Sequence, residues 1–373
     1  MAKTRTRRRP ARRASTKVRA GSAFVNASDL RGLRAAWRNK DLVLFLGAGV
    51  SIPYGLPAWK SLILELLFEQ ARGTRRLGPM LPHYLRAVAS WMTDYFDYDP
   101  LVLARMVERT LGSDSRSEIA PPLSATDQNL FLSRLRSHLY ANHRVPPGRT
   151  TLNAVVDLIA KSTANRGVAS VVTFNFDDLL ERELQKRRVK VQSVIDAKRV
   201  DGNSIPIVHA HGSIPRSGRI SRKDIVFTEP DYHRLTESVF HWSLSFIVER
   251  LRKNTALFIG LSMSDPNLRR LLDASRNSDI PPHWQIQKRH EIHDQQVLEV
   301  MRDVDRRARE YATVLGRQFN EIKNPQQLEE SIHAALRQAD SYDRQVFESL
   351  GVKTIWVDSF DQVTGVIDAI ATG

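Results

Sequence analysis

Apolar runs of five or six residues recur along this chain and are separated by longer stretches of mixed polarity. Four of the runs are long enough for buried strands: Leu42–Leu46, Val168–Thr173, Ile205–His209 and residues 255–260. In the stretches between them, apolar residues return every three or four positions, which is typical of helices that cover a sheet. The alternation predicts an α/β fold, a Rossmann-like parallel sheet flanked by helices.

The same alternation continues toward the C-terminus. Further strand candidates are residues 191–195, 284–287 and Val352–Val357. Helical spacing predicts helices at residues 152–160, 239–251, 291–315, 326–350 and 360–371. We therefore place one domain at residues 26–373.

Residues 75–150 have helical spacing without a strand pattern. Helices are predicted at residues 81–92, 101–111 and 130–140, with proline pairs between and after them. This stretch follows the first strand and the helix after it, which is expected to begin near Pro57. The pattern predicts a helical insertion within the sheet domain.

The first 20 residues hold nine Lys or Arg and no acid. Subtracting these nine from the net charge of +15 leaves +6 for the rest of the 373 residues. A segment this charged, with few large apolar residues, cannot bury a core, so a disordered basic tail is predicted at residues 1–25. The tail is read as a solvated segment, and contact with nucleic acid is the alternative that its charge suits.

The rest of the composition narrows the class of protein. Hydrophobic residues make up 42% of the chain, enough for a substantial core, and there is no cysteine. No disulfide framework is possible, which fits a reducing, cytoplasmic location. The longest apolar runs are far shorter than the roughly 20 residues that a bilayer requires, so no membrane association is expected.

Candidate chemistry gathers where three predicted strands end. The segments are GAGVS at residues 47–51, TFNFD at 173–177 and HAHG at 209–212. Carboxyl ends of parallel strands meet at one edge of a sheet, so these segments predict one nucleotide site. Glycines let backbone N–H groups approach a phosphate, and the helix after the turn is expected to direct its positive N-terminal end at it.

The glycine turn does not match two common nucleotide sites. A dehydrogenase fingerprint needs a third glycine at fixed offset and an acid about 20 residues on, but Gly55 is late and Glu65 lies inside the predicted helix. A phosphate-binding ATPase loop ends in Lys-Ser or Lys-Thr, which is missing here. Both classes are therefore disfavoured.

In this order the three segments resemble the sirtuin family, whose motifs Gly-Ala-Gly-x-Ser, Thr-x-Asn-x-Asp and His-Gly contribute to an NAD site. Three further segments resemble the bacterial sirtuin-like branch: DIVFTEPDYHRL at 224–235, GLSMSDPNL at 260–268 and KTIWV at 353–357. The resemblance extends from about residue 42 to residue 357. It implies NAD as the ligand.

One departure from that family is informative. Sirtuins that deacylate proteins usually carry four zinc-binding cysteines, and a chain without cysteine cannot form such a site. The resemblance therefore implies no metal and points to zinc-less bacterial relatives, which are commonly NAD hydrolases in antiphage defence. It also implies a homo-oligomer and a defence-system partner such as an ATPase.

The resemblance assigns catalytic roles to three residues. Asn175 would orient the water and the ribose, His211 would contact the ribose hydroxyls and act as general base, and Asp177 would lie near the nicotinamide. A histidine needs little pKa adjustment for this role. The alternative for Asn175 and Asp177 is a helix cap. Because side chains alternate along a strand, His209 is expected to face the core instead.

The resemblance also implies a set of NAD-binding residues, which contact the pyrophosphate after the first strand and the adenosine ribose after the second glycine turn. For the latter the alternative is a helix cap before Pro266. The predicted set is Gly47, Ala48, Gly49, Ser51, Thr173, Gly260, Ser262 and Asp265.

Two other functions remain open from the sequence. The first is an NAD-dependent protein deacylase or ADP-ribosyl transferase, in which the ribosyl chemistry is the same and the acceptor differs. The second is an NAD-gated module without catalysis, which recruits an ATPase or a nucleic-acid partner through the basic tail and the charged C-terminal helices.

Overall fold

The structure is a computed structural model of the chain. It describes residues 17–20, 23–73, 87, 91, 99–111, 124–197, 200–237, 241–263, 265–276, 281–292, 294–320 and 324–372.

A seven-stranded sheet lies at the centre of the protein, and all of its strand pairs are parallel. The strand order is β5-β6-β4-β3-β7-β8-β9. The strands are β3 (Leu42–Leu46), β4 (Val168–Thr173), β5 (Val191–Val194), β6 (Ile205–His209), β7 (Thr255–Ile259), β8 (His283–Lys288) and β9 (Val352–Val357). The predicted Rossmann-like α/β fold is confirmed.

Strand β3 occupies the middle of the sheet. The chain passes from β3 to β4 on one side and later returns to β7 on the other side. Such a reversal of strand order is the point at which open α/β sheets bind ligands, at the carboxyl ends of the strands. The loops after β3, β4, β6 and β7 therefore surround the expected site.

The central strands are apolar throughout because helices cover both faces of the sheet. All five residues of β3 and of β7 are buried. On one face Leu42, Leu44 and Leu46 pack in a large core cluster, and on the other face Val43 and Phe45 pack in a second cluster. The two-residue period of a strand thus sorts one apolar run between two cores.

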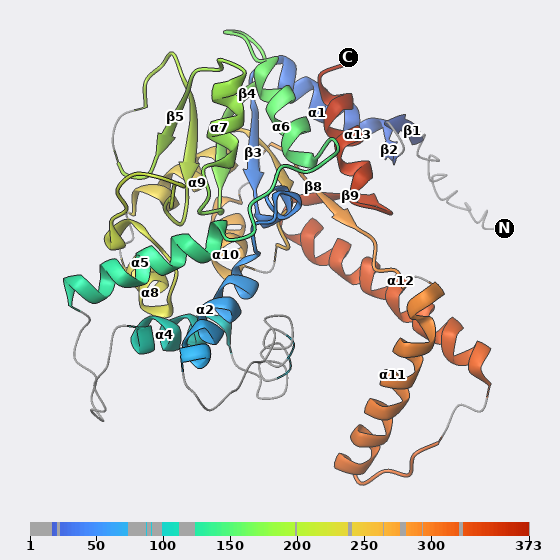
Figure 1. The fold of residues 1–373 in the computed structure, drawn as a ribbon. Coiled ribbons are helices and arrows are strands. Elements are labelled where there is room, and N and C mark those ends of the chain that lie inside the picture. The colour runs from blue at the N-terminus through green and yellow to red at the C-terminus, as the bar shows by residue number, and fades with distance from the viewer. Residues whose placement is uncertain are drawn as a thin grey trace, which may run out of the picture.

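The helices form two layers around the sheet (Figure 1). The first core cluster includes residues of α1 (Ala27–Arg38), α6 (Thr151–Ala160), α7 (Leu179–Lys186) and α13 (Asp361–Ile370). The second includes residues of α9 (Trp242–Lys253) and α10 (Pro266–Ser275). The helix predicted from residue 239 begins at Trp242, and residues 238–240 lie outside the described ranges.

The predicted insertion contains α4 (Pro100–Leu111) and α5 (Ala125–Tyr140), which pack on each other and on α2 (Trp59–Gly73). In Figure 1 the arrow of β3 points toward this group of helices. The short helix α8 (Glu229–Glu237) packs against α4. Apart from residues 87 and 91, the helix predicted at 81–92 lies outside the described ranges.

The long helices α11 (Asp294–Val314) and α12 (Pro325–Ser349) correspond to the predictions at 291–315 and 326–350. In Figure 1 α11 extends away from the sheet.

The N-terminal region differs from its prediction in part. Strands β1 (Lys17–Ala20) and β2 (Ala23–Asn26) form an antiparallel pair where a disordered tail was expected up to residue 25. Residues 1–16 of that tail lie outside the described ranges. In the part of the chain that the structure describes, no helix is both long and apolar enough to cross a membrane.

Candidate functional site

The two glycine turns at the switch point pack backbone against backbone. The N–H of Gly49 donates to the carbonyl of Gly260 at 3.0 Å, and the N–H of Gly47 donates to that of Ile259 at 3.1 Å. A Cβ on Gly47 would lie 2.5 Å from the carbonyl oxygen of Gly260, and one on Gly49 would lie 2.7 Å from its Cα. These glycines are thus required for the close packing of the turn after β3 on the turn after β7. From the sequence, phosphate binding was the only reason expected for them.

The geometry of the first turn also narrows its phosphate-binding role. The N–H groups of Gly47, Gly49, Val50 and Ser51 donate to backbone carbonyls within the protein. Among the described residues, the N–H of Ala48 has no such acceptor. The turn continues into two short 3-10 segments, and α2 begins only at residue 59. The start of α2 at Trp59 agrees with the helix predicted from near Pro57, and the two 3-10 segments separate its N-terminus from the glycine turn.

Asn175 is the residue that joins the glycine turn to the loop after β4. Its Nδ2 donates to the carbonyl of Gly47 at 3.0 Å and to Ser51 Oγ at 3.1 Å. Its backbone N–H donates to Thr173 Oγ1 at 3.1 Å, which gives buried Thr173 a role in shaping this loop. With Nδ2 held in this way, Oδ1 of Asn175 has no hydrogen-bond partner among the described residues.

Asp177 lies beneath this group and is buried. Ser51 Oγ donates to its Oδ2 at 2.8 Å, and the N–H of Leu179 donates to its Oδ1 at 3.1 Å. Burial raises the pKa of Asp177 to about 6, although both hydrogen bonds act to lower it. Both oxygens are therefore engaged in holding Ser51 and the start of α7.

His211 follows β6 and lies among three other side chains of the site. Phe174 and Tyr232 meet the His211 ring edge to face, with ring centroids 5.2 Å and 5.3 Å away. Tyr232 Oη lies 3.5 Å from His211 Nε2, and Asp265 Oδ2 lies 3.9 Å from the same nitrogen. Burial lowers the pKa of His211, and the negative charge of Asp265 opposes that shift.

A glycine fixes the turn that carries His211. Gly212 has a φ of +82°, and a Cβ there would lie 1.8 Å from the carbonyl oxygen of Asp224. Only glycine fits this conformation and this contact. The carbonyl of His211 accepts from the N–H of Val226 at 3.0 Å. The His-Gly pair thus brings the segment at 224–235 alongside the site.

His209 faces away from the site, as predicted. It is buried, and its Nε2 lies 2.6 Å from Oε1 of Glu181 on α7. Burial lowers the pKa of His209, but the charge and hydrogen bond of Glu181 outweigh that effect and raise it. The carbonyl of Asn175 lies 3.3 Å from His209 Nδ1. This ion pair therefore supports the backbone of the loop that carries Asn175.

The NAD-binding residues predicted at the second glycine turn differ in exposure and in contacts. Gly260 has a φ of +67° and is exposed, as is Ser262. Asp265 caps α10, since its Oδ1 accepts from the N–H of Asn267 at 2.8 Å and Pro266 occupies the first turn. Its other oxygen is the one directed at His211. One side chain thus caps α10 and approaches His211, and its contact with the adenosine ribose stays a prediction.

Sequence reasoning assigned no role to Tyr232 and did not single out Phe174 for the site. Tyr232 lies in the segment 224–235 that carried part of the family resemblance, so its position was marked but its contact was not. In the part of the chain that the structure describes, no cluster of three or more His, Cys, Asp or Glu residues could hold a metal ion.

The parallel sheet and its switch point define a Rossmann-like α/β domain, a fold that binds ligands at the carboxyl edge where these polar residues lie. Residues 169–330 match the family model of the SIR2-like domain. The matched stretch includes Asn175, Asp177 and His211, and the sheet places the glycine turn after β3 beside it although that turn precedes the match. A search of curated proteins gave no match. A SIR2-like domain indicates an NAD-related function.

Proposed function

We propose that this protein is an NAD hydrolase, which cleaves the bond between nicotinamide and ribose to give nicotinamide and ADP-ribose. The observation that carries the proposal is that Ser51, Asn175 and His211 follow three neighbouring strands at the switch point of the sheet, where Asn175 contacts Ser51. The match of residues 169–330 to the SIR2-like domain supports it. The arrangement of the three residues supports a site for a ribosyl group next to a polar amide and an imidazole.

The reaction does not require an acid to protonate the leaving group. The C1′–N1 bond breaks with its electron pair moving into the pyridinium ring, so nicotinamide leaves as a neutral molecule. The oxygen of a water bonds to C1′, and its proton passes to a base and then to solvent. The site must hold the ribose and the water in place and stabilise the cationic sugar.

His211 is the base in this proposal. Its lowered pKa keeps the imidazole neutral at pH 7, so that a nitrogen lone pair is available for the proton. The cause of that lowered pKa is burial, which disfavours the charged ring. The negative charge of Asp265, 3.9 Å away, would stabilise the imidazolium once it forms.

Asn175 orients the water and the ribose. Because Gly47 and Ser51 hold its Nδ2, the side-chain carbonyl is fixed in direction before any substrate arrives. A preorganised acceptor of this kind costs little reorganisation during the reaction. We assign Asp177 a positioning role, since its oxygens hold Ser51 and Leu179.

NAD binding is proposed along the edge formed by the two glycine turns. The N–H of Ala48 and the hydroxyl of Ser51 would meet the pyrophosphate, and Ser262 with Asp265 would meet the adenosine ribose. Gly47, Gly49 and Gly260 would contribute through the close packing of the turns rather than through direct contact. Water is the proposed acceptor because the chain has no cysteine for the zinc module of deacylating sirtuins.

The test is product analysis with purified full-length protein and NAD. We expect nicotinamide and ADP-ribose in equal amounts. The rate should fall at least about 100-fold in His211→Ala, which loses the general base, and by a similar factor in Asn175→Ala, which loses a preorganised polar group. His143→Ala is the matched control, since His143 contacts Arg216 outside the site. Nicotinamide release only with an acylated peptide or another protein acceptor would instead establish a deacylase or an ADP-ribosyl transferase.

The biological setting is proposed from the family resemblance alone. There the enzyme depletes NAD in the bacterial cytoplasm during phage infection, as a homo-oligomer activated by a defence-system partner such as an ATPase. Deleting residues 1–16 tests the role of the basic tail. NAD hydrolysis should survive the deletion, whereas loss of nucleic-acid binding would assign the tail to that contact.

A further inference from the structure

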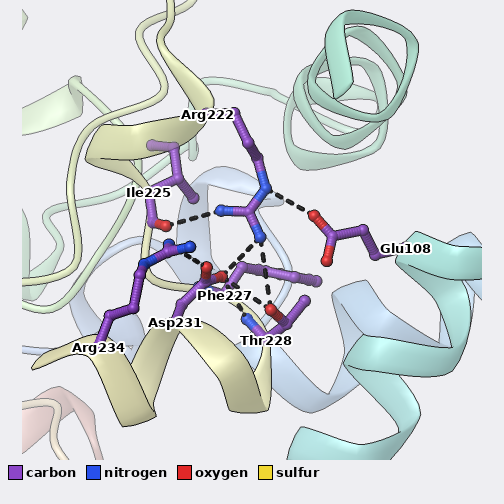
Figure 2. A network of polar contacts seen from close by, with 7 residues as sticks. All are labelled: Glu108, Arg222, Ile225, Phe227, Thr228, Asp231 and Arg234. Atoms are coloured by element: carbon purple, nitrogen blue, oxygen red, sulfur yellow. Dashed lines mark hydrogen bonds and ion pairs between the residues drawn. The ribbon is translucent and has the colours of Figure 1, made fainter. Parts of the chain in front are cut away.

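A buried chain of charges connects the helical insertion to α8. Arg222 Nε donates to Oε1 of Glu108 on α4 at 2.6 Å, and its Nη2 donates to Oδ2 of Asp231 on α8 at 2.7 Å (Figure 2). Arg222 Nη1 donates to the carbonyl of Ile225 at 2.9 Å. The guanidinium therefore bridges α4 and α8 and holds the loop that precedes α8.

Asp231 is the residue of this charged network that lies on α8 and fixes the start of that helix. It is the third residue of the helix, and its Oδ2 accepts from the backbone N–H of Thr228 at 2.8 Å and of Phe227 at 3.0 Å. An acid at this position that binds the N–H before the helix forms half of a capping box. Arg234, one turn later, donates to the other oxygen of Asp231 (Figure 2). The start of α8 is thus fixed by a fully engaged carboxylate.

The three charged side chains of this network are shielded from water, so their contacts strongly constrain how α4 and α8 lie relative to each other. The side chains of Glu108, Arg222 and Asp231 are 13%, 11% and 1% exposed. Burial alone would raise the pKa of Asp231, but the Arg222 charge and hydrogen bonds outweigh this and hold it below its usual value. Buried ion pairs of this kind select one arrangement of their helices, since a broken pair leaves an uncompensated charge.

Packing reinforces the same arrangement. The ring of Phe227, between Ile225 and α8, meets Phe131 of α5 at 5.7 Å and Phe176 of the loop after β4 at 5.9 Å. Trp59 of α2 lies 6.2 Å from it. The segment before α8 therefore rests on the insertion on one side and on the site loop on the other.

Tyr232 follows Asp231 directly, and its hydroxyl reaches the site. Oη lies 3.5 Å from His211 Nε2, at the outer limit of hydrogen-bond distance, with Asp265 Oδ2 at 3.9 Å from the same nitrogen. Burial, together with the charges of Asp265 and Asp231, raises the pKa of Tyr232, so the phenol stays neutral at physiological pH. A carboxylate can only accept, so this side of the ring favours a proton on Nε2.

We propose that Tyr232 is a positioning residue for His211, which with Asp265 keeps the imidazole proton on Nε2 and leaves Nδ1 to accept the proton of the attacking water. The insertion sets the place of Tyr232 through the chain Glu108, Arg222 and Asp231. This inference rests on the proposed function of His211 as a base. It makes the helical insertion part of the catalytic arrangement, since a shift of α4 moves the phenol relative to the imidazole.

The test is a ¹⁵N NMR measurement of the His211 ring in the full-length protein, assigned with His211→Gln. Ring nitrogen shifts report which nitrogen carries the proton, and a pH titration reports the pKa. The titratable groups that reach His211 are Asp265 and Tyr232. In the wild type we expect the proton on Nε2. Tyr232→Phe should reduce that fraction and lower the pKa, because it removes an acceptor that favours the cation.

Two further variants separate the insertion from general damage. Glu108→Gln should shift the ring in the same direction as Tyr232→Phe, to a smaller extent. Arg105→Gln is the matched control, since Arg105 and Glu229 form a more exposed ion pair between the same two helices at 3.1 Å. It should leave the titration of His211 unchanged. A common melting temperature would exclude unfolding as the cause.

Kinetics give the second readout. For Tyr232→Phe we expect kcat for nicotinamide release to fall about three- to tenfold, the equivalent of one hydrogen bond, with KM for NAD little changed and the acidic limb of the pH profile moved to lower pH. A proton on Nδ1 in the wild type, or a Tyr232→Phe ring identical to the wild type, would overturn the inference. Absence of NAD turnover in a wild type whose ring responds as expected would contradict NAD hydrolysis by this protein alone, and not the role of Tyr232 in setting the proton position on His211.

Discussion

Asp177 offers a quantitative test of how the site is built. Its pKa rises from 3.8 to about 6 because the carboxyl is buried. For an acid, a raised folded-state pKa means that the unfolded chain ionises first as pH rises. Folding is therefore penalised progressively between about pH 4 and pH 6. A shift of about two pKa units corresponds to a destabilisation of about 3 kcal/mol. This destabilisation is fully present above about pH 6 and absent below about pH 4.

The perturbation is Asp177→Asn, which keeps the shape and removes the ionisation. Any hydrogen bond that the amide loses with Ser51 is a constant cost at every pH. The free energy of unfolding of the wild type, relative to the variant, should therefore fall by about 3 kcal/mol between pH 4 and pH 7. Urea unfolding at half-unit pH intervals, with fixed ionic strength, measures this difference directly.

Asp224→Asn is the control, because Asp224 is exposed. It removes a carboxylate at the surface by the same substitution. Parallel curves for the wild type and Asp177→Asn would refute the reasoning, since they would mean that burial does not disfavour the charged form. A wild type that gains stability relative to the variant as pH rises would mean that the hydrogen bonds from Ser51 and Leu179 outweigh burial.

Two further changes test the supports of the site. His209→Gln leaves Glu181 buried without its partner and should lower the free energy of unfolding by about 3–5 kcal/mol at pH 6 in urea unfolding. Because the pKa of His209 is raised, the contribution of its charge is full below about pH 6.5 and declines as pH rises through the folded-state value. Gly212→Ala forces a Cβ against the Asp224 carbonyl at positive φ and should cost about 1–3 kcal/mol, seen as a lower melting temperature. Gly202→Ala is the control, because a Cβ there meets open space and the backbone of Gly202 lies outside the left-handed region.

Much of the sheet could be predicted because its strands have to be apolar on both faces. Leu42–Leu46 and the run ending at residue 260 are continuous apolar segments, and a five-residue run of this kind between two helical stretches has few other uses. The placement of Asn175 and His211 after the adjacent strands β4 and β6 followed from the rule that parallel strands end at one edge. These inferences needed only local pattern and the order of the motifs.

The details of the site depend on contacts between distant residues, which one sequence does not encode locally. The packing of Gly49 against Gly260 requires the adjacency of β3 and β7. Glu108 and Arg222 are 114 positions apart, so the local sequence around either residue does not predict their ion pair. The engagement of both Asp177 oxygens likewise depends on Ser51, which approaches only after the sheet has formed. The antiparallel pair at residues 17–26 was missed because its charge pattern is that of a solvated segment.

The measurement that tests the central claim most directly is nicotinamide release from NAD by the purified full-length protein. It should be compared with Asn175→Ala and His211→Ala after NAD binding has been measured for all three. The account predicts stoichiometric nicotinamide and ADP-ribose from the wild type and near-complete loss in both variants. Release that persists in both variants would contradict the assignment of the site, and NAD binding without release at any protein concentration would contradict hydrolysis by this chain alone.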